Sequence, residues 1–264
     1  HIDGQPKAGD WVRVRAHKGA VLGWGHFAPN ASIAVRMLTF NEHLPDDAWW
    51  HATIAAAVRV RKDLDLFGTP NQNACRLVHA EGDGLPGLIA DFYEGVLVVQ
   101  CHTPGMHRAL PILTAAFREA LGPALLGIYD KSAKAMAKNG GDQSVDGWAW
   151  GKAPHGHAAT EYGCKYPIDW EHGQKTGFFL DQRENRALLA AHAKDKKILN
   201  GNSQIRRPVA RKRLPAWWPA RWHAAAACPQ GTGSPPGHVG PFKVLYKAIY
   251  LSLCPLPPPP LYIK

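Results

Sequence analysis

The composition of the chain changes sharply at Asn200, and this break limits what the chain can fold into. Residues 1–200 carry 22 Lys and Arg against 21 Asp and Glu, whereas residues 201–264 carry nine Lys and Arg and no acidic residue. The second segment also holds 12 of the 22 prolines. Because each proline removes a backbone donor and fixes φ, such a segment rarely forms a regular domain. We therefore expect folded domains before Asn200 and an irregular tail after it.

The formal net charge of +10 belongs almost entirely to this basic tail, residues 201–264. Two interpretations of the tail stay open. One is a frameshifted or misjoined segment that is not native coding sequence, which the complete lack of acidic residues favours. The other is a genuine disordered tail that binds RNA phosphates while Trp217, Trp218 and Trp222 stack on bases. Either origin predicts nonspecific affinity for nucleic acid.

The cysteines indicate a reducing compartment. Their number is odd and they show no CxxC spacing, which argues against a disulfide framework or a zinc knuckle; they are Cys75, Cys101, Cys164, Cys228 and Cys254. No apolar run reaches the length of a membrane span, and no signal-peptide pattern is present. We expect a cytoplasmic protein.

Hydrophobic periodicity predicts a mixture of strands and helices before Asn200. Strands are predicted at residues 11–15, 21–27, 33–40, 75–80, 88–91, 96–101 and 125–129. Helices are predicted from a cap at Asp46–Asp47 to Lys62 and over residues 106–121. Residues 161–164 and 166–170 are predicted to form a hairpin. A capping box of Asp181 and Glu184 then starts a helix that ends near Lys194, and residues 197–200 begin a buried parallel strand.

Three other patterns have ordinary explanations. Residues 82–87 match GxGxxG, but a strand-like segment with Pro86 in the loop favours a glycine-rich hairpin turn over a dinucleotide site. His155, His157 and Cys164 fit no usual zinc spacing. Cys75 and Cys101 lie in predicted strands and are interpreted as small buried apolar residues.

Arg13, Arg15 and Arg36 could share one face of the first three strands. Such a face can bind RNA phosphates, and it can equally be a solvated strand surface.

The run HGQKTGFFLDQRENR, residues 172–186, concentrates several kinds of chemistry. Lys175-Thr176-Gly177 predicts a turn, and the two phenylalanines that follow can serve the core and a ligand. Asp181, Gln182 and Arg183 then offer an acceptor, an amide and a cation. This cluster can hold a zwitterion or a flipped base. The alternative is a helix entry with a capping aspartate and two core phenylalanines.

This run resembles the signature of the bacterial large-subunit ribosomal RNA 5-methylcytosine methyltransferases, the PUA-domain class of S-adenosylmethionine enzymes. Other segments resemble the same family in the same order: GWGHFAPNASIAVRMLTF from Gly23, CRLVHAEGDGLPGLIADFYEGVLVVQ from Cys75, IYDKSA from Ile128 and EYGCKYPIDWEHG from Glu161. The resemblance covers roughly residues 9–200.

The resemblance implies a cofactor, a substrate and a set of site residues. The cofactor is S-adenosyl-L-methionine, and its neighbourhood is expected at Lys175, Thr176, Phe178, Asp181, Gln182 and Arg183. In the family a cysteine thiolate adds to C6 of cytosine, C5 takes the methyl group, and a base removes the C5 proton. The implied partner is ribosomal RNA, and a homodimer is one possible assembly.

The resemblance ends at Asn200. There the family continues with a glycine-rich turn of the type FSYTGGF, where this chain has GNSQIRRPVARKRL. No acidic residue follows to bind the ribose hydroxyls, and neither Cys228 nor Cys254 has the family's catalytic context. The family's catalytic cysteine is therefore absent, and we expect this chain to be inactive.

The resulting fold class is α/β in an α+β multi-domain arrangement. We expect an incomplete PUA-like RNA-binding domain at 1–41, a central α+β domain at 42–158, the start of a Rossmann-like methyltransferase domain at 159–200 and the tail at 201–264. Two functions compete: a methyltransferase that forms 5-methylcytosine in large-subunit ribosomal RNA, and a non-catalytic RNA-binding fragment.

Overall fold

The computed structural model describes residues 2–29, 31–138, 144–153 and 157–192. The basic tail and the predicted strand at 197–200 lie outside the described residues. Within them, no helix is long and apolar enough to cross a membrane. The described residues belong to one compact unit that spans residues 1–194.

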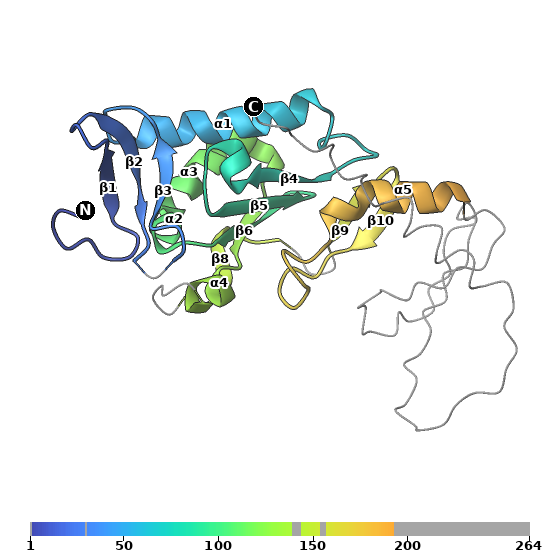
Figure 1. The fold of residues 1–264 in the computed structure, drawn as a ribbon. Coiled ribbons are helices and arrows are strands. Elements are labelled where there is room, and N and C mark those ends of the chain that lie inside the picture. The colour runs from blue at the N-terminus through green and yellow to red at the C-terminus, as the bar shows by residue number, and fades with distance from the viewer. Residues whose placement is uncertain (1, 30, 139–143, 154–156, 193–264) are drawn as a thin grey trace, which may run out of the picture. The chain divides into compact units, whose positions relative to one another are not determined.

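The chain begins with a three-stranded antiparallel sheet of order β1-β2-β3 (Figure 1). Its strands are β1 (Trp11–Arg15), β2 (Val21–Phe27) and β3 (Val35–Thr39). The predicted meander is confirmed, with a third strand shorter than expected at both ends. The sheet packs its Trp11 side chain against the main hydrophobic core, which is formed by residues between Leu38 and Met136.

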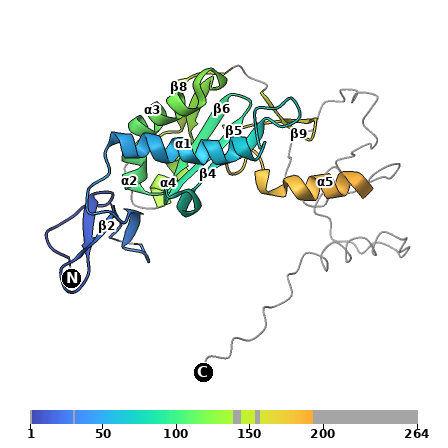
Figure 2. The ribbon, with the colours of Figure 1, turned by 90° about the horizontal axis from the view of Figure 1, so that it is seen from above.

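Helix α1 (Asp47–Asp63) follows, and the predicted cap is confirmed because the Asp46 carboxylate accepts a hydrogen bond from the Trp49 amide at 2.9 Å. Its buried face carries Trp50, Ile54 and Val58 into the main core. Figure 2 shows α1 lying along one side of the central sheet, next to α3.

The central sheet has five strands in the order β4-β5-β6-β7-β8. They are β4 (Ala74–His79), β5 (Leu88–Tyr93), β6 (Val96–Cys101), β7 (Gly127–Asp130) and β8 (Gly147–Gly151). Only the β6–β7 pair is parallel. Strands β5 and β6 are buried almost throughout because one core covers each face of the sheet. Strand β8 was not predicted.

The crossover from β6 to β7 corrects one prediction. The expected helix at 106–121 is two helices, α2 (Pro104–Arg108) and α3 (Leu110–Leu121), followed by the short 3-10 helix η2 (Gly122–Ala124). Pro111 lies in the first turn of α3 and has no N–H to donate to the preceding turn, so the helix restarts at Ala109. Helix α4 (Ala133–Lys138) follows β7.

The GxGxxG segment forms a turn between antiparallel strands, as expected. The 3-10 helix η1 (Ala80–Asp83) and the left-handed Gly84 connect β4 to β5. The predicted hairpin after residue 158 is present, but its register was wrong. Its strands are β9 (Ala158–Glu161) and β10 (Cys164–Pro167), and residues 162–163 form the turn, with φ of 49° and 76°. A two-residue turn with two positive φ values matches the twist of a hairpin. The predicted strand at 161–164 is therefore wrong, because residues 162 and 163 form this turn.

The described chain ends with η3 (Leu180–Gln182) and α5 (Arg183–His192). The predicted capping box is wrong because Asp181 lies inside the 3-10 turn and its carboxylate accepts from Lys175 instead. Glu184 accepts from the Tyr162 hydroxyl at 2.7 Å.

Candidate functional site

The motif segment forms a tight turn between the β9–β10 hairpin and α5. The amide of Gly177 donates to the Gln174 carbonyl at 2.8 Å, and Lys175 adopts a left-handed φ of 52°. Gly177 has a φ of 116°, and a Cβ there would lie 2.8 Å from the Asp169 carbonyl oxygen. Glycine is therefore required at this position.

Thr176 points inward, and it is fully buried. Its hydroxyl donates to Oδ2 of Asp91 at 2.6 Å and lies 2.8 Å from the Tyr93 hydroxyl. Arg76 pairs with the same carboxylate through two hydrogen bonds of 2.8 and 3.0 Å. The structure thus places Thr176 against the central sheet rather than at the surface.

Lys175 and Asp181 lie on the exposed side of the turn. The Lys175 ammonium is 3.1 and 3.2 Å from the two carboxylate oxygens of Asp181, and 4.6 Å from the ring centroid of Phe179. Partial burial raises the pKa of Asp181, but hydrogen bonds from Lys175 and Gln182 outweigh it and hold the pKa below its ordinary value. Asp181 is therefore ionised at neutral pH, beside an exposed aromatic ring.

Phe178 and Arg183 belong to a different environment. The Arg186 guanidinium stacks 4.4 Å from the Phe178 ring centroid and donates to the buried Glu161 carboxylate at 2.6 to 2.9 Å. Arg183 Nε lies 3.8 Å from the same carboxylate. Of the six residues predicted near the cofactor, Lys175, Asp181 and Gln182 are exposed, whereas Thr176 is buried and Phe178 and Arg183 are half-buried.

Sequence reasoning missed four residues that hold this turn: Asp91, Tyr93, Gln100 and Lys131. They lie 42 to 85 residues upstream of the residues they contact, in or just after strands of the central sheet. An aspartate inside an otherwise apolar strand was the available signal, because a buried carboxylate needs partners.

The three predicted RNA-binding arginines of the first sheet differ in their exposure and their ion pairing. Arg13 and Arg15 are exposed on β1, with the Arg13 guanidinium 5.6 Å from the Trp24 ring centroid. Arg36 pairs with Glu81 at 2.8 Å. Strand pairing sets His26 opposite both Trp11 and Arg36, so the alternation of side chains puts Arg13 and Arg36 on one face of the sheet. The register shifts between Val14 and Arg15, so this pairing does not assign Arg15 to that face.

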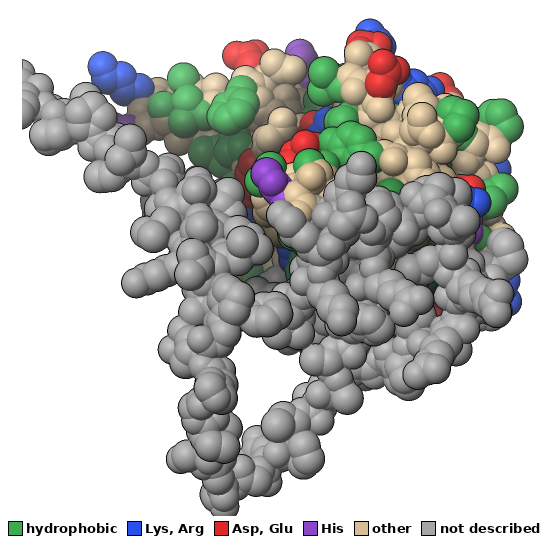
Figure 3. Space-filling view, turned by 90° about the vertical axis from the view of Figure 1, so that its right-hand side faces the viewer, with side chains coloured by type: hydrophobic (Ala, Val, Ile, Leu, Met, Phe, Trp, Pro, Cys, Tyr) green, Lys and Arg blue, Asp and Glu red, His purple; other side chains and the backbone are tan. Residues whose placement is uncertain are grey.

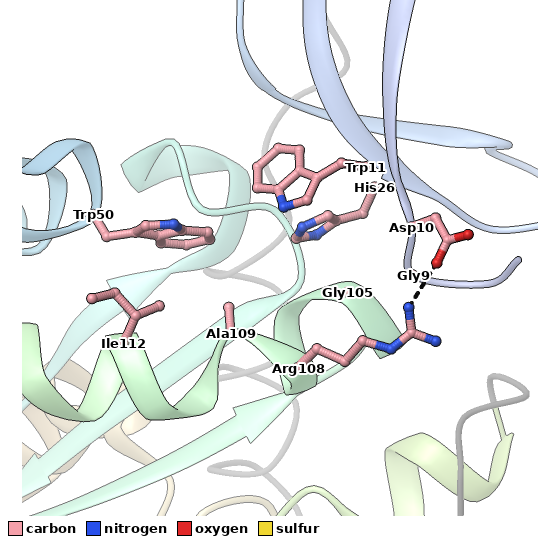
Figure 4. Close-up of a pocket in the computed structure, with 9 residues that line it drawn as sticks. All are labelled: Gly9, Asp10, Trp11, His26, Trp50, Gly105, Arg108, Ala109 and Ile112. Atoms are coloured by element: carbon pink, nitrogen blue, oxygen red, sulfur yellow. Dashed lines mark hydrogen bonds and ion pairs between the residues drawn. The ribbon is translucent and has the colours of Figure 1, made fainter. Parts of the chain in front are cut away.

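A cavity of about 510 Å³ lies between this sheet and the helices of the central unit. Figure 4 shows the rings of Trp11, His26 and Trp50 turned toward a shared space, with Ala109 and Ile112 on its other side. Arg108 closes one edge through an ion pair with Asp10 at 2.9 Å. Burial lowers the pKa of His26 to about 4, so its imidazole is neutral at neutral pH.

The three cysteines within the described residues are not activated. Cys75 and Cys101 are fully buried, as predicted, and burial raises the pKa of each thiol to about 12. Burial also raises the pKa of Cys164. Cys228 and Cys254 lie outside the described residues. Among the described residues no group of three potential metal ligands occurs. Of the three residues for which the sequence showed no usual zinc spacing, His155 lies outside the described residues. His157 instead contacts the backbone oxygens of Tyr93 and Glu94 at 2.7 Å.

Charges of both signs are interspersed on the described surface visible in Figure 3, with apolar side chains between them. This agrees with the balanced charge of residues 1–200. The described side chains visible in this view do not by themselves form a basic field of the kind that indicates a nucleic-acid surface.

Comparison of the fold defines the class of protein first. Residues 1–40 match the family described as a PUA-like domain. A solved structure from Streptococcus mutans, described as a candidate SAM-dependent methyltransferase, shares the fold with a TM-score of 0.62 and 22% identity over 75% of this chain and 50% of its own. A second, described as a candidate methyltransferase complexed with SAH, has a TM-score of 0.63 and 22% identity over 74% of this chain and 49% of its own. The chain therefore has a PUA-like region followed by a methyltransferase-like fold.

Relatives by sequence are more specific. The chain is 36% identical over 202 residues to ribosomal RNA large subunit methyltransferase I of Pseudoalteromonas atlantica, and 37% identical over 198 residues to the protein of that name from Shewanella denitrificans. Each match covers 75% of this chain and 49% of the relative, so the chain spans about half the length of these relatives. The resemblance seen in the sequence is confirmed: over about half of their length, proteins named ribosomal RNA large subunit methyltransferase I are similar to this chain.

Proposed function

We propose that this chain derives from an S-adenosylmethionine-dependent methyltransferase that forms 5-methylcytosine in large-subunit ribosomal RNA, and that the polypeptide itself binds RNA without catalysis. The observation that carries the proposal is the 36% identity over 202 residues to a large-subunit ribosomal RNA methyltransferase. The seating of the motif turn on the central sheet supports it, because an ordered turn is what a cofactor-facing segment needs.

The cofactor side of the proposal uses the exposed half of the turn. In the complete methyltransferase of the proposed lineage, Asp181 would bind the ammonium of the methionine moiety, and the exposed rim of Phe179 would cover an apolar part of the ligand. Gln182 adds an exposed amide. Thr176 has its hydroxyl committed to protein partners and would act through the backbone it holds. When bound, the cofactor supplies the methyl group.

The missing thiolate supports the non-catalytic part of the proposal. Cytosine C5 methylation needs a thiolate that adds to C6. Cys75, Cys101 and Cys164 all have raised pKa values and so remain thiols at neutral pH. The sequence after Asn200 also lacks the glycine-rich turn that would approach the cofactor.

The RNA side of the proposal uses the first sheet. Arg13 and Arg15 are exposed neighbours on β1, and cations at that spacing can bind adjacent phosphates. Arg36 contributes if RNA displaces Glu81, since their ion pair is 31% and 62% exposed at the two side chains. The protein is proposed to work in the cytoplasm, and a homodimer is a further possible assembly.

Two measurements test the proposal. Titration calorimetry of the full chain with S-adenosylmethionine should show no micromolar binding, and filter binding should show retention of a large-subunit ribosomal RNA fragment. A second protein, in which the segment after Asn200 is replaced by the corresponding half of the Pseudoalteromonas relative, should transfer a labelled methyl group to cytosine C5. Failure of this chimera to methylate, although folded and able to bind the cofactor, would contradict the proposed lineage. Micromolar cofactor binding by the original chain would contradict its non-catalytic assignment.

A further inference from the structure

The turn around Lys175 has an internal backbone hydrogen bond, from the Gly177 amide to the Gln174 carbonyl at 2.8 Å, but other features of its backbone oppose its conformation. Lys175 is a non-glycine residue in the left-handed region, with a φ of 52°. That conformation costs an L-residue on the order of 1 kcal/mol, and it persists when surrounding contacts determine it. Gly173 and Gly177, on either side, are in addition the residues with the largest backbone freedom. Contacts from elsewhere must therefore add to this internal hydrogen bond to hold the turn.

Three such contacts come from the central sheet. The Lys131 ammonium donates to the Gly173 carbonyl at 2.7 Å, and the Gln100 amide donates to the Lys175 carbonyl at 3.3 Å. At the next residue after Lys175, the Thr176 hydroxyl donates to Asp91 at 2.6 Å. The turn is thus held at three residues out of four consecutive ones.

The partners lie on adjacent strands, which makes them a single surface. Asp91 and Tyr93 belong to β5, Gln100 belongs to β6, and Lys131 directly follows β7. These strands are neighbours in the sheet, so the groups are fixed relative to one another by ladder hydrogen bonds. We call Asp91, Tyr93, Gln100 and Lys131 the turn clamp.

The proton positions at the centre of the clamp follow from the chemistry. Arg76 holds the Asp91 carboxylate through two hydrogen bonds, which keeps it an acceptor. The single hydroxyl proton of Thr176 therefore goes to Asp91, and the Tyr93 hydroxyl donates to Thr176. Burial, followed by the Asp91 charge, raises the pKa of Tyr93, which keeps its proton available. Removing the Thr176 hydroxyl would leave two buried polar groups short of a partner.

We propose that the turn clamp is a positioning device: it holds the Lys175–Gly177 turn in its left-handed conformation and thereby sets where Lys175 and Phe179 are presented. Asp91, Tyr93, Gln100 and Lys131 are positioning residues that act through the turn. Thr176 is the residue they bind, not a ligand of the cofactor. That the presented side chains face a cofactor rests on the proposed function; the clamping of the turn does not.

Hydrogen–deuterium exchange of the full chain, read on peptides that cover residues 172–180, tests the clamp directly. Thr176→Val keeps the shape and removes the hydroxyl with its two hydrogen bonds, so exchange there should rise about tenfold or more, while β5 and β6 stay protected. Thr176→Ser keeps the hydroxyl and should restore protection. Thr53→Val removes a hydroxyl bonded inside α1 at 2.8 Å and should leave residues 172–180 unchanged.

Lys131→Met provides an independent variant in which the buried carboxylate network is untouched. The rate of hydrogen–deuterium exchange in residues 172–180 should rise, and this rise should exceed any increase elsewhere in the chain. The proposal is overturned if neither Thr176→Val nor Lys131→Met produces such a local rise, or if Thr176→Ser behaves like Thr176→Val. Because this measurement uses neither cofactor nor RNA, its result is independent of the methylation assay.

Discussion

His26 occupies a site in which burial, rather than a partner, determines its protonation. Its side chain packs on Gly105, where a Cβ would lie 2.3 Å from the His26 Cγ, and its Nδ1 has no hydrogen-bond partner. Burial, with a smaller contribution from the Arg108 charge, lowers its pKa to about 4. Protonation of this imidazole therefore opposes the folded state.

Acidification should accordingly destabilise the protein through His26. Between pH 6.5 and about 4 the unfolded chain binds a proton at this imidazole that the folded chain does not, so stability falls as the pH falls through that window. The full difference is roughly 3 kcal/mol. Urea unfolding of wild type and His26→Gln across this range measures it, and the variant should lack this component. A difference between the two proteins that is constant with pH would contradict the prediction.

Helix α5 depends on ion pairing because it buries no residue completely. Arg186 attaches the helix to the preceding segments through three contacts. It binds Glu161 of β9, donates to the Phe179 carbonyl at 2.8 Å and stacks on Phe178. Glu161 is 2% exposed. A buried carboxylate that loses its partner costs more than the pair contributes.

Arg186→Met should therefore destabilise the docking of α5 by about 3 kcal/mol, since Glu161 would stay buried with only the more distant Arg183 nearby. The double variant Glu161→Leu with Arg186→Met removes both charges and should recover much of the loss. Lys165→Met, on the exposed edge of β10, is the control and should change stability little. Denaturant midpoints followed by circular dichroism measure all three. Equal stability of Arg186→Met and Lys165→Met would show that the pair does not hold the helix.

For the molecule as a whole, the distribution of charge determines how RNA can be bound. Residues 1–200 are nearly neutral, so their contribution must come from a few placed cations rather than from net charge. Arg13 and Arg15 are the exposed pair in the PUA-like region.

Arg13→Gln and Arg15→Gln should each lower the salt dependence of RNA binding. The slope of log affinity against log salt should shrink by about 0.7 to 0.9 per arginine, because each contact with a phosphate releases a counterion. Fluorescence anisotropy with a large-subunit ribosomal RNA fragment, on the full chain at several salt concentrations, gives the slope. Arg118→Gln, which removes a guanidinium stacked 4.6 Å from the Trp150 ring centroid, should leave it unchanged. Identical slopes for all variants would remove the first sheet from the RNA interface.

Local sequence patterns predicted the helices and strands that are determined by interactions between residues close in the sequence. The alternation at Trp11–Arg15 and the cap at Asp46 identified β1 and α1 because side-chain periodicity and capping act within a few residues. The break before Pro111 and the turn at Tyr162–Gly163 were missed, although both have local causes. Strand β8 was missed because its pairing with β7 is not encoded in its own short sequence.

The motif at residues 172–186 was visible from its order of residue types, and the family resemblance that it carried is confirmed by the relatives. Its division into a buried anchor and an exposed face was not visible. Thr176 and Lys175 are adjacent and both carry polar groups, yet Thr176 is fully buried and Lys175 is exposed. The difference arises from Asp91, 85 residues away, which the sheet brings within hydrogen-bond distance. Residue order therefore carries the lineage and the local elements, because these depend on near neighbours. The role of each polar side chain depends on which distant group supplies its partner, and folding alone brings those groups together.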